Sequence, residues 1–528
     1  MRERRLLLGD EAIALGAVHA GLSGCYAYPG TPSTEITEFV QGDATARARG
    51  IHCRWSSNEK TAMEEALGMS YMGKRAIVCM KHVGMNVCAD AFVNSAMTGT
   101  NGGLVVVAAD DPSMHSSQNE QDSRFYGKFA MVPVFEPSSQ QEAYDMMKDA
   151  FCMSEEYKIP VLLRIVTRMA HSRAVVETGE IREPNPMRYP DNPKEWVLLP
   201  AVARRRNERL TGMQKDLERR SEYNKYIDGA DTSVGIIACG IAYNYLMENF
   251  KDGCPHPVLK VSQYPLPVNA VRRLASKCQS LLVLEDGQPV VEEMLLGVLE
   301  QSVRIEGRLS GAVPRTGELT PDNVASALGL KNEEVFAPSE LVMPRPPALC
   351  RGCGHRDMFA ALNNVLSEYA NPRVFGDIGC YTLGYLPPYQ ALHSVVDMGA
   401  SITMAKGAAD AGQWPSVAVI GDSTFTHSGM TGLLDAVNSK SNIVIIISDN
   451  LTTGMTGGQD SAGTGRIESI CLGIGVEPEH VRTVIPLPKN MAEMEDIIRQ
   501  EIEYQGVSVI VPRRECIQTA RRHAKQTK

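Results

Sequence analysis

The sequence predicts an α/β protein that consists of three domains, each built on a doubly wound parallel sheet. Its 528 residues exceed what one hydrophobic core usually organises. In three parts of the chain, short apolar runs alternate with segments of helical periodicity and with Gly/Pro turns, which is the pattern of strand–helix–strand units around a parallel sheet. Hydrophobic residues make up 43% and charged residues 22% of the chain, so a mainly disordered protein is excluded.

The first predicted domain comprises residues 1–175. Its strand-sized apolar runs include residues 76–80 and 104–109, and helical stretches separate them. Residues 176–232 are instead rich in Pro, Arg, Asn and Glu. We expect this segment to be a linker that contains one polar helix near residues 200–222.

A smaller second domain is predicted at residues 233–310, where apolar runs begin at Val258 and Leu281. The Gly-x-Gly-x-x-Gly pattern of a dinucleotide-binding turn does not follow its first strand, so a nicotinamide or flavin site is not indicated. Residues 311–345 form a second predicted linker, and residues 346–528 form the third domain. The expected strands of this domain are residues 417–420, 443–447 and 507–511.

The net charge of the chain is −9 at pH 7, with a pI near 5.8. An acidic protein has no general attraction to phosphate backbones or anionic lipids, so nucleic acid and membrane partners are not expected. The N-terminus lacks the long apolar region and the cleavage site of a signal peptide, and the apolar runs are only strand-sized. We therefore expect a cytoplasmic protein whose thirteen cysteines stay reduced.

Two polar turns at the ends of apolar runs give the strongest chemical signal. Asp422 follows the run 417–420, and Asn450 lies just beyond the run 443–447, with a helix-sized stretch between them. Both residues are expected at the carboxyl ends of adjacent parallel strands, where such sheets bind ligands. Carboxylate and amide oxygens suit Mg²⁺, which keeps phosphate oxygens in its remaining positions. Two ordinary strand-to-helix turns are the alternative, because Gly-Asp and Asp-Asn are common there.

Four cysteines form a second group. Cys350 and Cys353 make a Cys-x-x-Cys pair, Cys380 follows, and Cys516 lies near the C-terminus. In a reduced compartment four thiolates can bind an iron–sulfur cluster or zinc. A redox disulfide and burial as small hydrophobic residues are the other interpretations. The remaining cysteines lack partners in the pattern and are predicted to belong to the core.

The spacing of Asp422 and Asn450 is similar to the diphosphate motif of thiamine-dependent enzymes. These enzymes also need a glutamate against the aminopyrimidine ring of thiamine diphosphate, at the start of a helix in a separate domain. Glu59 fits this requirement, since it opens a predicted helix in the first domain with the family's alanine and glycine spacing behind it. The structural alternative for this residue is a capping box, Ser56-x-x-Glu59.

Longer strings narrow the resemblance. The matching strings are Leu7–Ala12, Tyr28–Ser33, Gly376–Leu383, Asp397–Ala400 and Gly454–Gln459. On these strings the chain resembles, over essentially its whole length, the alpha subunits of indolepyruvate:ferredoxin oxidoreductases. The resemblance implies a pyrimidine-binding domain, a transketolase-C-like domain and a diphosphate-binding domain in that order, so two of the three domains would be thiamine-diphosphate-binding folds.

The resemblance also implies cofactors and site residues. Asp422, Asn450 and the backbone carbonyl of Thr452 would bind Mg²⁺, and Thr31 would contact the carboxylate of a 2-oxo acid. Asn86 and the polar loop 110–119 would line the pocket, although a Pro-Gly turn at Thr31 and a Ser/Asn loop are first of all a turn and a solvated loop. Further residues at the cofactor would be Gly421, Ser423, Thr424 and His355. One 4Fe-4S cluster would have the ligands Cys350, Cys353, Cys380 and Cys516.

The function that the resemblance implies is the oxidative decarboxylation of aryl 2-oxo acids, such as indolepyruvate and phenylpyruvate, to acyl-CoA, with electrons passed to ferredoxin. The implied partners are a smaller beta subunit, ferredoxin or a similar electron carrier, coenzyme A and the 2-oxo acid. A non-oxidative thiamine-diphosphate-dependent decarboxylase and a catalytically silent scaffold subunit are the alternatives.

One departure from the family concerns the C-terminus. The usual alpha subunit ends in a ferredoxin-like segment with two Cys-x-x-Cys-x-x-Cys runs, which does not follow Cys516 here. We therefore expect electrons to leave through a cluster in the diphosphate-binding domain, through a cluster on a partner, or through a carrier that docks directly.

Overall fold

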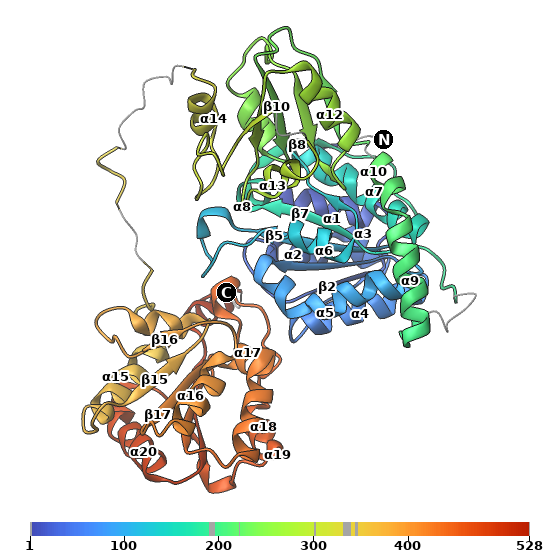
Figure 1. Cartoon of the computed structure of the whole chain (residues 1–528). Coiled ribbons are helices and arrows are strands. Elements are labelled where there is room, and N and C mark those ends of the chain that lie inside the picture. The colour runs from blue at the N-terminus through green and yellow to red at the C-terminus, as the bar shows by residue number, and fades with distance from the viewer. Residues whose placement is uncertain are drawn as a thin grey trace. The chain divides into compact units, whose positions relative to one another are not determined.

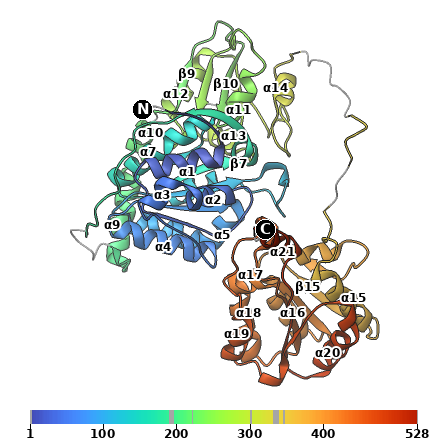
Figure 2. The same cartoon turned by 180° about the vertical axis from the view of Figure 1, so that it is seen from behind.

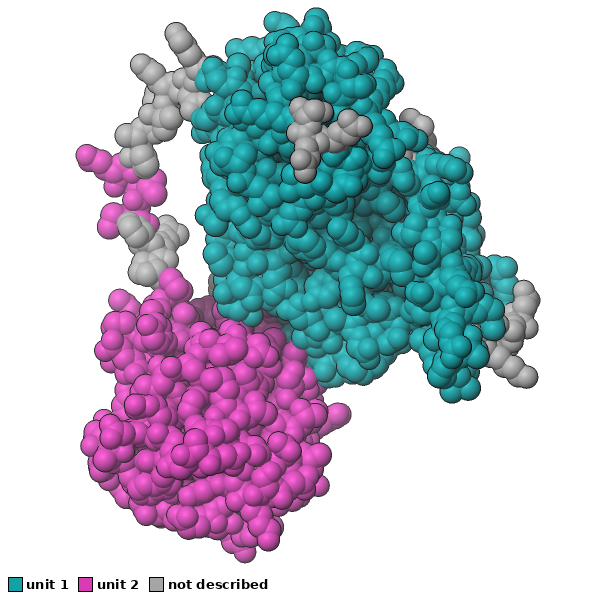
Figure 3. All heavy atoms as spheres, in the orientation of Figure 1, with its two compact units in different colours: residues 1–337 teal, residues 338–528 magenta. Residues whose placement is uncertain are grey.

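The computed structural model describes residues 3–189, 196–220, 222–299, 303–330, 339–343 and 347–526. The chain forms two compact units, unit 1 (Met1–Ala337) and unit 2 (Pro338–Lys528) (Figure 3). Unit 1 contains a seven-stranded sheet, a five-stranded sheet and a two-stranded ribbon, and unit 2 contains a six-stranded sheet. Helices connect strands that are mostly parallel in the three large sheets, so the predicted α/β class is confirmed.

The seven-stranded sheet of unit 1 has the order β12-β6-β7-β5-β4-β2-β3. Its strands are β2 (Gly24–Ala27), β3 (His52–Trp55), β4 (Ala76–Lys81), β5 (Leu104–Asp110), β6 (Val134–Phe135), β7 (Val161–Val166) and β12 (Gln263–Tyr264). All pairs are parallel except β6 with β12. The central strands β4, β5 and β7 are almost entirely buried, as their continuous apolar runs predict for a parallel sheet with both faces covered.

Helices cover both faces of this sheet. α1 packs against α7 on one face, and α4 packs against α5 on the other (Figure 1). A ribbon of β1 (Arg4–Leu8) and β8 (Arg173–Glu177) pairs the start of the chain with the end of this part. The helices are α1 (Gly9–His19), α2 (Thr34–Gly42), α3 (Ala44–Ala48), α4 (Glu59–Tyr71), α5 (His82–Thr98), α6 (Arg124–Ala130), α7 (Gln140–Tyr157) and α8 (Thr167–His171).

The five-stranded sheet of unit 1 has the order β14-β13-β10-β11-β9, and only β9 runs antiparallel to its neighbour. Its strands are β9 (Lys225–Ile227), β10 (Val234–Cys239), β11 (Val258–Val261), β13 (Ser280–Leu284) and β14 (Arg304–Glu306). Figure 2 shows this smaller sheet with the helices of the same part of the chain around it. These helices are α11 (Ala242–Met247), α12 (Val268–Lys277), α13 (Val290–Leu296) and α14 (Pro321–Ala327).

The first predicted linker contains more regular structure than the sequence indicates. Where one polar helix is expected, the structure has two, α9 (Pro200–Gly212) and α10 (Gln214–Arg219), which meet at Met213. The linker also supplies β9, whose three residues are too few to give a periodicity signal. The second predicted linker contains α14, and its residues 331–338 and 344–345 lie outside the described residues.

The sheet of unit 2 is parallel throughout, in the order β16-β15-β17-β18-β20-β19. Successive residues of β17 alternate between two cores, with Val417 and Val419 on one face and Ala418 and Ile420 on the other. The strands are β15 (Arg373–Gly376), β16 (Ser394–Val395), β17 (Ser416–Gly421), β18 (Ile443–Ser448), β19 (Val481–Val484) and β20 (Val507–Pro512). The helices are α15 (Gly354–Leu366), α16 (Ala400–Asp410), α17 (Asp422–Thr424), α18 (Met430–Asn438), α19 (Ile467–Ile474), α20 (Met491–Glu503) and α21 (Ile517–Gln526).

Among the helices that the structure describes, none has the length and apolar character needed to cross a membrane.

Candidate functional site

Three neighbouring strands of unit 2 end in acidic residues at one edge of the sheet. β15, β17 and β18 lie side by side, and Asp377, Asp422 and Asp449 follow their last residues. In the register of β17 and β18, Gly421 lies opposite Ser448. Asp422 and Asn450 therefore leave adjacent parallel strands at the same edge, as the sequence predicts.

The Asp422 carboxylate is suited to a cation. Its side chain is buried, and Oδ2 has no hydrogen-bond partner. Burial raises the pKa of Asp422 to about 7, the negative charge of Asp449 adds to the rise, and the Ser461 hydroxyl opposes it. A buried carboxylate oxygen without a partner is costly unless a proton or a cation reaches it, so this position favours a metal ligand.

The loop after β18 brings the other predicted residues to the same place. Leu451 has a left-handed backbone with a φ of 61°, and the amide of Thr452 donates to Asn450 Oδ1 at 3.1 Å. Ser423 Oγ lies 2.7 Å from Thr453 Oγ1, a contact that links the two predicted motifs. Thr424 donates to the carbonyl of Ile378 at 3.0 Å. The strand ends of β15, β17 and β18 are thus joined by hydroxyl groups.

The four predicted cysteines gather around one cavity of about 80 Å³ in unit 2, which Asp449 and Asn450 also line. None of them forms a disulfide; Cys350 is exposed and the other three are half-buried. Burial raises the pKa of Cys380 to about 12, and the charges of the other three thiols act in the same direction. Four thiolates in one place therefore require a positive group among them. The cysteines are Cys350, Cys353, Cys380 and Cys516.

His355 lies in the first turn of α15, beside this cysteine group. Its Nδ1 is 3.0 Å from the sulfur of Cys353. Burial lowers the pKa of His355 to about 4, and Nε2 has no hydrogen-bond partner. The imidazole is therefore neutral at pH 7.

The remaining cysteines correct part of the sequence prediction. Six of the nine are buried as predicted, and Cys53 and Cys254 are half-buried and pack against the core. Cys152 is half-buried and accepts a hydrogen bond from Arg182 at 3.1 Å. Cys25 has partners. The pairing of β2 with β3 places it opposite Cys53, and hydrogen bonds with Cys53 and Cys79 lower the pKa of Cys25. The sequence pattern could not show this, since it depends on strand register.

A second group of candidate residues lies at the carboxyl edge of the seven-stranded sheet in unit 1. Thr31 follows β2, Glu59 follows β3, and Lys81 ends β4, and these three strands are neighbours. Glu59 is buried at the start of α4. A Cβ atom on Gly84 of α5 would lie 2.7 Å from Glu59 Cγ, so glycine at position 84 makes the space for the Glu59 side chain.

The capping-box explanation of Glu59 is wrong. The residue that caps α4 is Asn58, whose side chain accepts from the amide of Thr61 at 2.8 Å. Ser56 instead donates to Glu65 at 2.7 Å. Because α4 begins at Glu59 itself, this glutamate stands too early in the helix to close a box with Ser56.

The turn at Thr31 is held by local hydrogen bonds and lies against a lysine. Ser33 Oγ donates to the carbonyl of Gly30 at 2.8 Å, and the amide of Gly30 donates to Thr34 Oγ1 at 3.1 Å. A Cβ atom on Gly30 would lie 3.1 Å from Lys81 Cβ. Burial lowers the pKa of Lys81 to about 8, and Asp111 opposes this shift. Thr31 therefore has a cation beside its turn that the sequence analysis missed.

The polar loop 110–119 is more ordered than a solvated loop. Asp111 accepts hydrogen bonds from the amide of Ser116 at 2.8 Å and from the hydroxyl of Ser117. Lys81 donates to the carbonyl of Ser116 at 2.6 Å. Asn86 is exposed in the first turns of α5 and accepts a hydrogen bond from Tyr126. Most side chains of residues 113–119 nevertheless face solvent.

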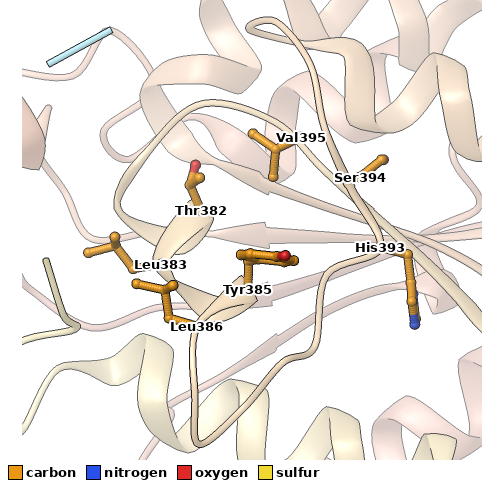
Figure 4. Close-up of a pocket in the computed structure, with 7 residues that line it drawn as sticks. All are labelled: Thr382, Leu383, Tyr385, Leu386, His393, Ser394 and Val395. Carbon is orange, nitrogen blue, oxygen red and sulfur yellow. The ribbon is translucent and has the colours of Figure 1, made fainter. Parts of the chain in front are cut away.

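A further cavity of about 420 Å³ lies in unit 2, next to the cysteine group. Figure 4 shows that one part of its lining comes from the turn after Cys380 and the other from the segment around β16. Leu383 lines both this cavity and the one with the cysteines. The lining residues are Thr382, Leu383, Tyr385, Leu386, His393, Ser394 and Val395.

Lys81, His82 and Asp377 are further polar residues at these edges that the sequence did not identify. Lys81 ends the buried strand β4, His82 follows it, and Asp377 follows the partly buried strand β15, as Asp422 follows β17. His82 is buried, and its Nδ1 has no hydrogen-bond partner. Asp377 is buried and accepts hydrogen bonds from Tyr381 and from Ser401 Oγ at 2.6 Å.

Two protein-family models match the regions that carry these two edges. Residues 15–230 match the thiamine-diphosphate-binding domain of pyruvate flavodoxin/ferredoxin oxidoreductases, and residues 377–511 match the C-terminal thiamine-pyrophosphate-binding domain of thiamine pyrophosphate enzymes. The chain is also 41% identical over 549 aligned positions to the indolepyruvate oxidoreductase subunit IorA of Archaeoglobus fulgidus, with 97% of this chain and 86% of the relative covered. The chain belongs to the IorA family.

A second IorA protein, from Methanothermobacter marburgensis, is 40% identical over 544 positions, which cover 98% of this chain and 87% of the relative. Among solved structures, 2-oxoglutarate:ferredoxin oxidoreductase from Magnetococcus marinus is similar with a TM-score of 0.52 and 16% identity, covering 62% of this chain and 65% of that one. This likeness concerns the fold alone. Membership of the IorA family confirms the resemblance drawn from the sequence, and the two matched domains confirm thiamine diphosphate as a cofactor.

Proposed function

We propose that the chain is the large catalytic subunit of an enzyme that oxidatively decarboxylates aryl 2-oxo acids, such as indolepyruvate and phenylpyruvate, to acyl-CoA and passes the electrons to ferredoxin. The observation that carries the proposal is that the cavity lined by the four cysteines is also lined by Asp449 and Asn450. A redox centre is needed beside the thiamine cofactor in an oxidoreductase, whereas a non-oxidative decarboxylase has no use for one.

Mg²⁺ fits the edge of the unit 2 sheet. Asp422 offers a buried carboxylate oxygen without a partner, and Asn450 and the carbonyl of Thr452 would complete a set of hard oxygen donors. A divalent cation also favours the ionised form of Asp422 against the effect of burial on its pKa. Gly421, Ser423 and Thr424 would lie next to the diphosphate.

A 4Fe-4S cluster fits the cysteine group better than the alternatives. Zinc–sulfur bonds of about 2.3 Å place the sulfurs of a tetrahedral zinc site ~3.8 Å apart. Among the described residues, no three of these sulfurs lie within 4.8 Å of one another. A four-iron cluster holds its sulfurs further apart, because each binds a different iron atom. The exposure of Cys350 argues against the alternative that these cysteines are small hydrophobic core residues. Cys516 belongs to the same group, because it lines the same cavity as the other three.

The candidate residues of unit 1 would bind the aminopyrimidine ring of thiamine diphosphate and the substrate. Thiamine diphosphate, when bound, supplies a carbon nucleophile and an electron sink for the decarboxylation of 2-oxo acids. Glu59, fixed by the space at Gly84, would exchange a proton with the aminopyrimidine ring. Thr31 would donate a hydrogen bond to the substrate carboxylate, and Lys81 would supply the positive charge that balances it. Asn86 and the loop 110–119 would border this site.

We further infer that residues 1–175 bind the pyrimidine, residues 233–310 form the transketolase-C-like domain, and residues 346–528 bind the diphosphate. The neutral imidazole of His355 would pack at the cofactor without adding charge beside the cysteines. The names of the IorA relatives support an aryl rather than a small substrate.

The proposed partners follow from the same site. A smaller beta subunit would complete the enzyme, and ferredoxin or a similar carrier would receive electrons near the exposed Cys350. Arg521 and Arg522 of α21 stand next to this region, since Gln518 of the same helix donates to the Cys350 sulfur at 3.4 Å. Positive charge beside the electron exit favours an acidic carrier. A cytoplasmic location would keep these thiols reduced.

The test is an anaerobic assay of the chain co-expressed with its smaller partner, supplied with thiamine diphosphate and Mg²⁺. We expect reduction of a viologen dye that requires both a 2-oxo acid and coenzyme A, with indolepyruvate and phenylpyruvate turned over faster than pyruvate or 2-oxoglutarate. Iron and acid-labile sulfide are measured in the same sample. Release of CO₂ without dye reduction, in a protein that lacks iron, would establish the non-oxidative decarboxylase instead.

A further inference from the structure

Three side chains of unit 1 converge at a place that the proposed function does not use. Asp10 lies at the start of α1, Glu35 at the start of α2, and His171 at the end of α8. One donor atom from each lies within 4.8 Å of the other two. Two carboxylates and an imidazole at this spacing offer both oxygen and nitrogen donors to one ligand.

Asp10 is the residue that requires a ligand. Its side chain is 0% exposed, and neither carboxylate oxygen has a hydrogen-bond partner. Glu35 Oε2 is also buried and without a partner. Burial raises the pKa of Asp10 well above its ordinary value, and the negative charges of Glu35 and Glu11 act in the same direction. A carboxylate in this position is stable only with a proton or a cation next to it.

Helix capping does not account for Asp10. The neighbouring Glu11 caps the helix, since its Oε2 accepts hydrogen bonds from the amide of Leu8 at 2.8 Å and from Arg173 at 3.1 Å. Asp10 makes no such bond. Gly9 instead allows α1 to approach α8, because a Cβ atom there would lie 2.1 Å from the carbonyl oxygen of Met169. Close packing of the two helices thus holds Asp10 against His171.

A shared proton satisfies this group less well than a metal ion. One proton could join one oxygen of Asp10 to Oε2 of Glu35, whose Oε1 already lies beside His171, but the second oxygen of Asp10 would remain buried without a partner. A metal ion can take an oxygen from each carboxylate together with His171 Nε2, which lies 3.6 Å from Glu35 Oε1. The side chains of Glu35 and His171 are 37% and 36% exposed, so solvent can reach the place and complete the coordination.

We propose that Asp10, Glu35 and His171 bind a divalent metal ion that accepts mixed oxygen and nitrogen ligands, such as Mn²⁺ or Zn²⁺. The imidazole distinguishes this site from the all-oxygen Mg²⁺ site proposed at Asp422. The ion ties α1, α2 and α8 together. Because Ser33 directly precedes α2, it also fixes the turn that contains Thr31.

The experiment is a titration of the full chain with Mn²⁺ in the presence of thiamine diphosphate and excess Mg²⁺, with free Mn²⁺ counted by electron paramagnetic resonance. Mn²⁺ is chosen because thiolates bind it weakly, so the cysteine group does not interfere. Asp10→Asn and His171→Gln remove ligands, and Asp422→Asn removes the other site. Glu11→Gln is the matched control, since it removes a neighbouring charge and keeps the hydrogen bond to Leu8.

The wild-type chain and Glu11→Gln should each bind one Mn²⁺ at this site. Asp10→Asn and His171→Gln should lose this Mn²⁺, and Asp422→Asn should retain it. Pulsed spectra of the Mn²⁺ bound to the wild type should show coupling to an imidazole nitrogen. Because His171 is partly exposed, loss of this Mn²⁺ in His171→Gln tests the site even if Asp10→Asn folds poorly. If Asp10→Asn and His171→Gln bind as much Mn²⁺ as the wild type, or if no nitrogen coupling is found, Asp10 and Glu35 share a proton and the proposal fails.

Discussion

Glu59 depends on a glycine in another helix. Its carboxylate is buried in the first turn of α4, and the missing side chain of Gly84 in α5 gives it room. A methyl group at position 84 would lie 2.7 Å from Glu59 Cγ and 2.8 Å from Oε1. The orientation of the proposed proton-transfer group is therefore set by the packing of α4 on α5.

Gly84→Ala is expected to lower turnover about 100-fold, because a displacement of a reacting group by about 1 Å has this effect. In a helix alanine is favoured over glycine by about 1 kcal/mol, so the free energy of unfolding should not decrease to the extent that turnover does. Steady-state kinetics and thermal unfolding measure the two. Gly68→Ala is the control, since it lies in the same helix as Glu59 and has open space at its Cβ position. Equal activity in both variants would show that the space at Gly84 is unimportant.

Asp377 should make the stability of unit 2 depend on pH. Burial raises its pKa from 3.8 to about 7, so the folded state binds a proton that the unfolded state releases between these values. Stability should therefore fall as the pH rises from 4 to 7, by at most about 4 kcal/mol. Urea unfolding of the apoprotein at several pH values measures this slope. Asp422 of the same unit has its pKa raised to about 7 as well, so Asp377→Asn should reduce the slope by about half. A slope unchanged in that variant would assign the dependence to other groups.

At the scale of elements, the two edges proposed to bind thiamine diphosphate are rows of strand ends. The positions of Asp422 and Asn450 could be predicted, because each follows an apolar run whose length and composition already indicate a buried strand. Glu59 could be predicted from the helix that it opens rather than from the strand before it, since β3 is short and only partly buried. Lys81 ends β4 and Asp377 follows β15, yet their residue types carry no distinguishing pattern. Their proximity to a site can be recognised only when the order of the strands in the sheet is known.

Other features could not be predicted because they arise from packing between distant segments. Asp10, Glu35 and His171 come from three helices, and no spacing in the sequence relates them. The pairing of Cys25 with Cys53 depends on register, and β9 is too short to leave a signal. The four cysteines around one cavity are an intermediate case, since the Cys-x-x-Cys pair is local and Cys516 joins it through the position of α21.

Cys516 is the cysteine whose role is most informative to test. As the residue before α21, it lines the same cavity as the Cys-x-x-Cys pair. Cys516→Ser should reduce the iron content of anaerobically purified protein by at least half, because a four-iron cluster loses one of its thiolate ligands. Cys254→Ser is the control, a half-buried cysteine of unit 1. Iron and sulfide at wild-type levels in Cys516→Ser would exclude it as a ligand.

At the scale of the whole molecule, a buried ion network joins the two large sheets of unit 1. Arg164 on β7 donates to Asp110 and to the carbonyl of Asp286, both at 2.7 Å, and also pairs with Glu136. Arg124 contacts Glu285 at 3.0 Å. Asp286 and Glu285 follow the last strand residues of β13, so the network connects the seven-stranded and five-stranded sheets. Both arginines are buried.

Arg164→Leu is expected to destabilise unit 1 by about 3–5 kcal/mol, because it leaves buried carboxylates without their positive partner. The measurement is calorimetric unfolding. Arg168→Leu is the matched control, since Arg168 is half exposed and pairs with Glu318, a surface contact worth about 1 kcal/mol at most. If the two variants unfolded at the same temperature, the buried network would contribute no more than a surface pair.

The central claim is that the cysteine group forms a redox centre that accepts electrons from the thiamine site. The most direct test is to mix the anaerobic, cofactor-loaded complex with one equivalent of indolepyruvate and to record electron paramagnetic resonance spectra. We predict a reduced iron–sulfur signal that develops in the wild type, and that is absent in Glu59→Gln and in Cys380→Ser. Consumption of indolepyruvate with no reduced cluster in the wild-type enzyme would contradict this account.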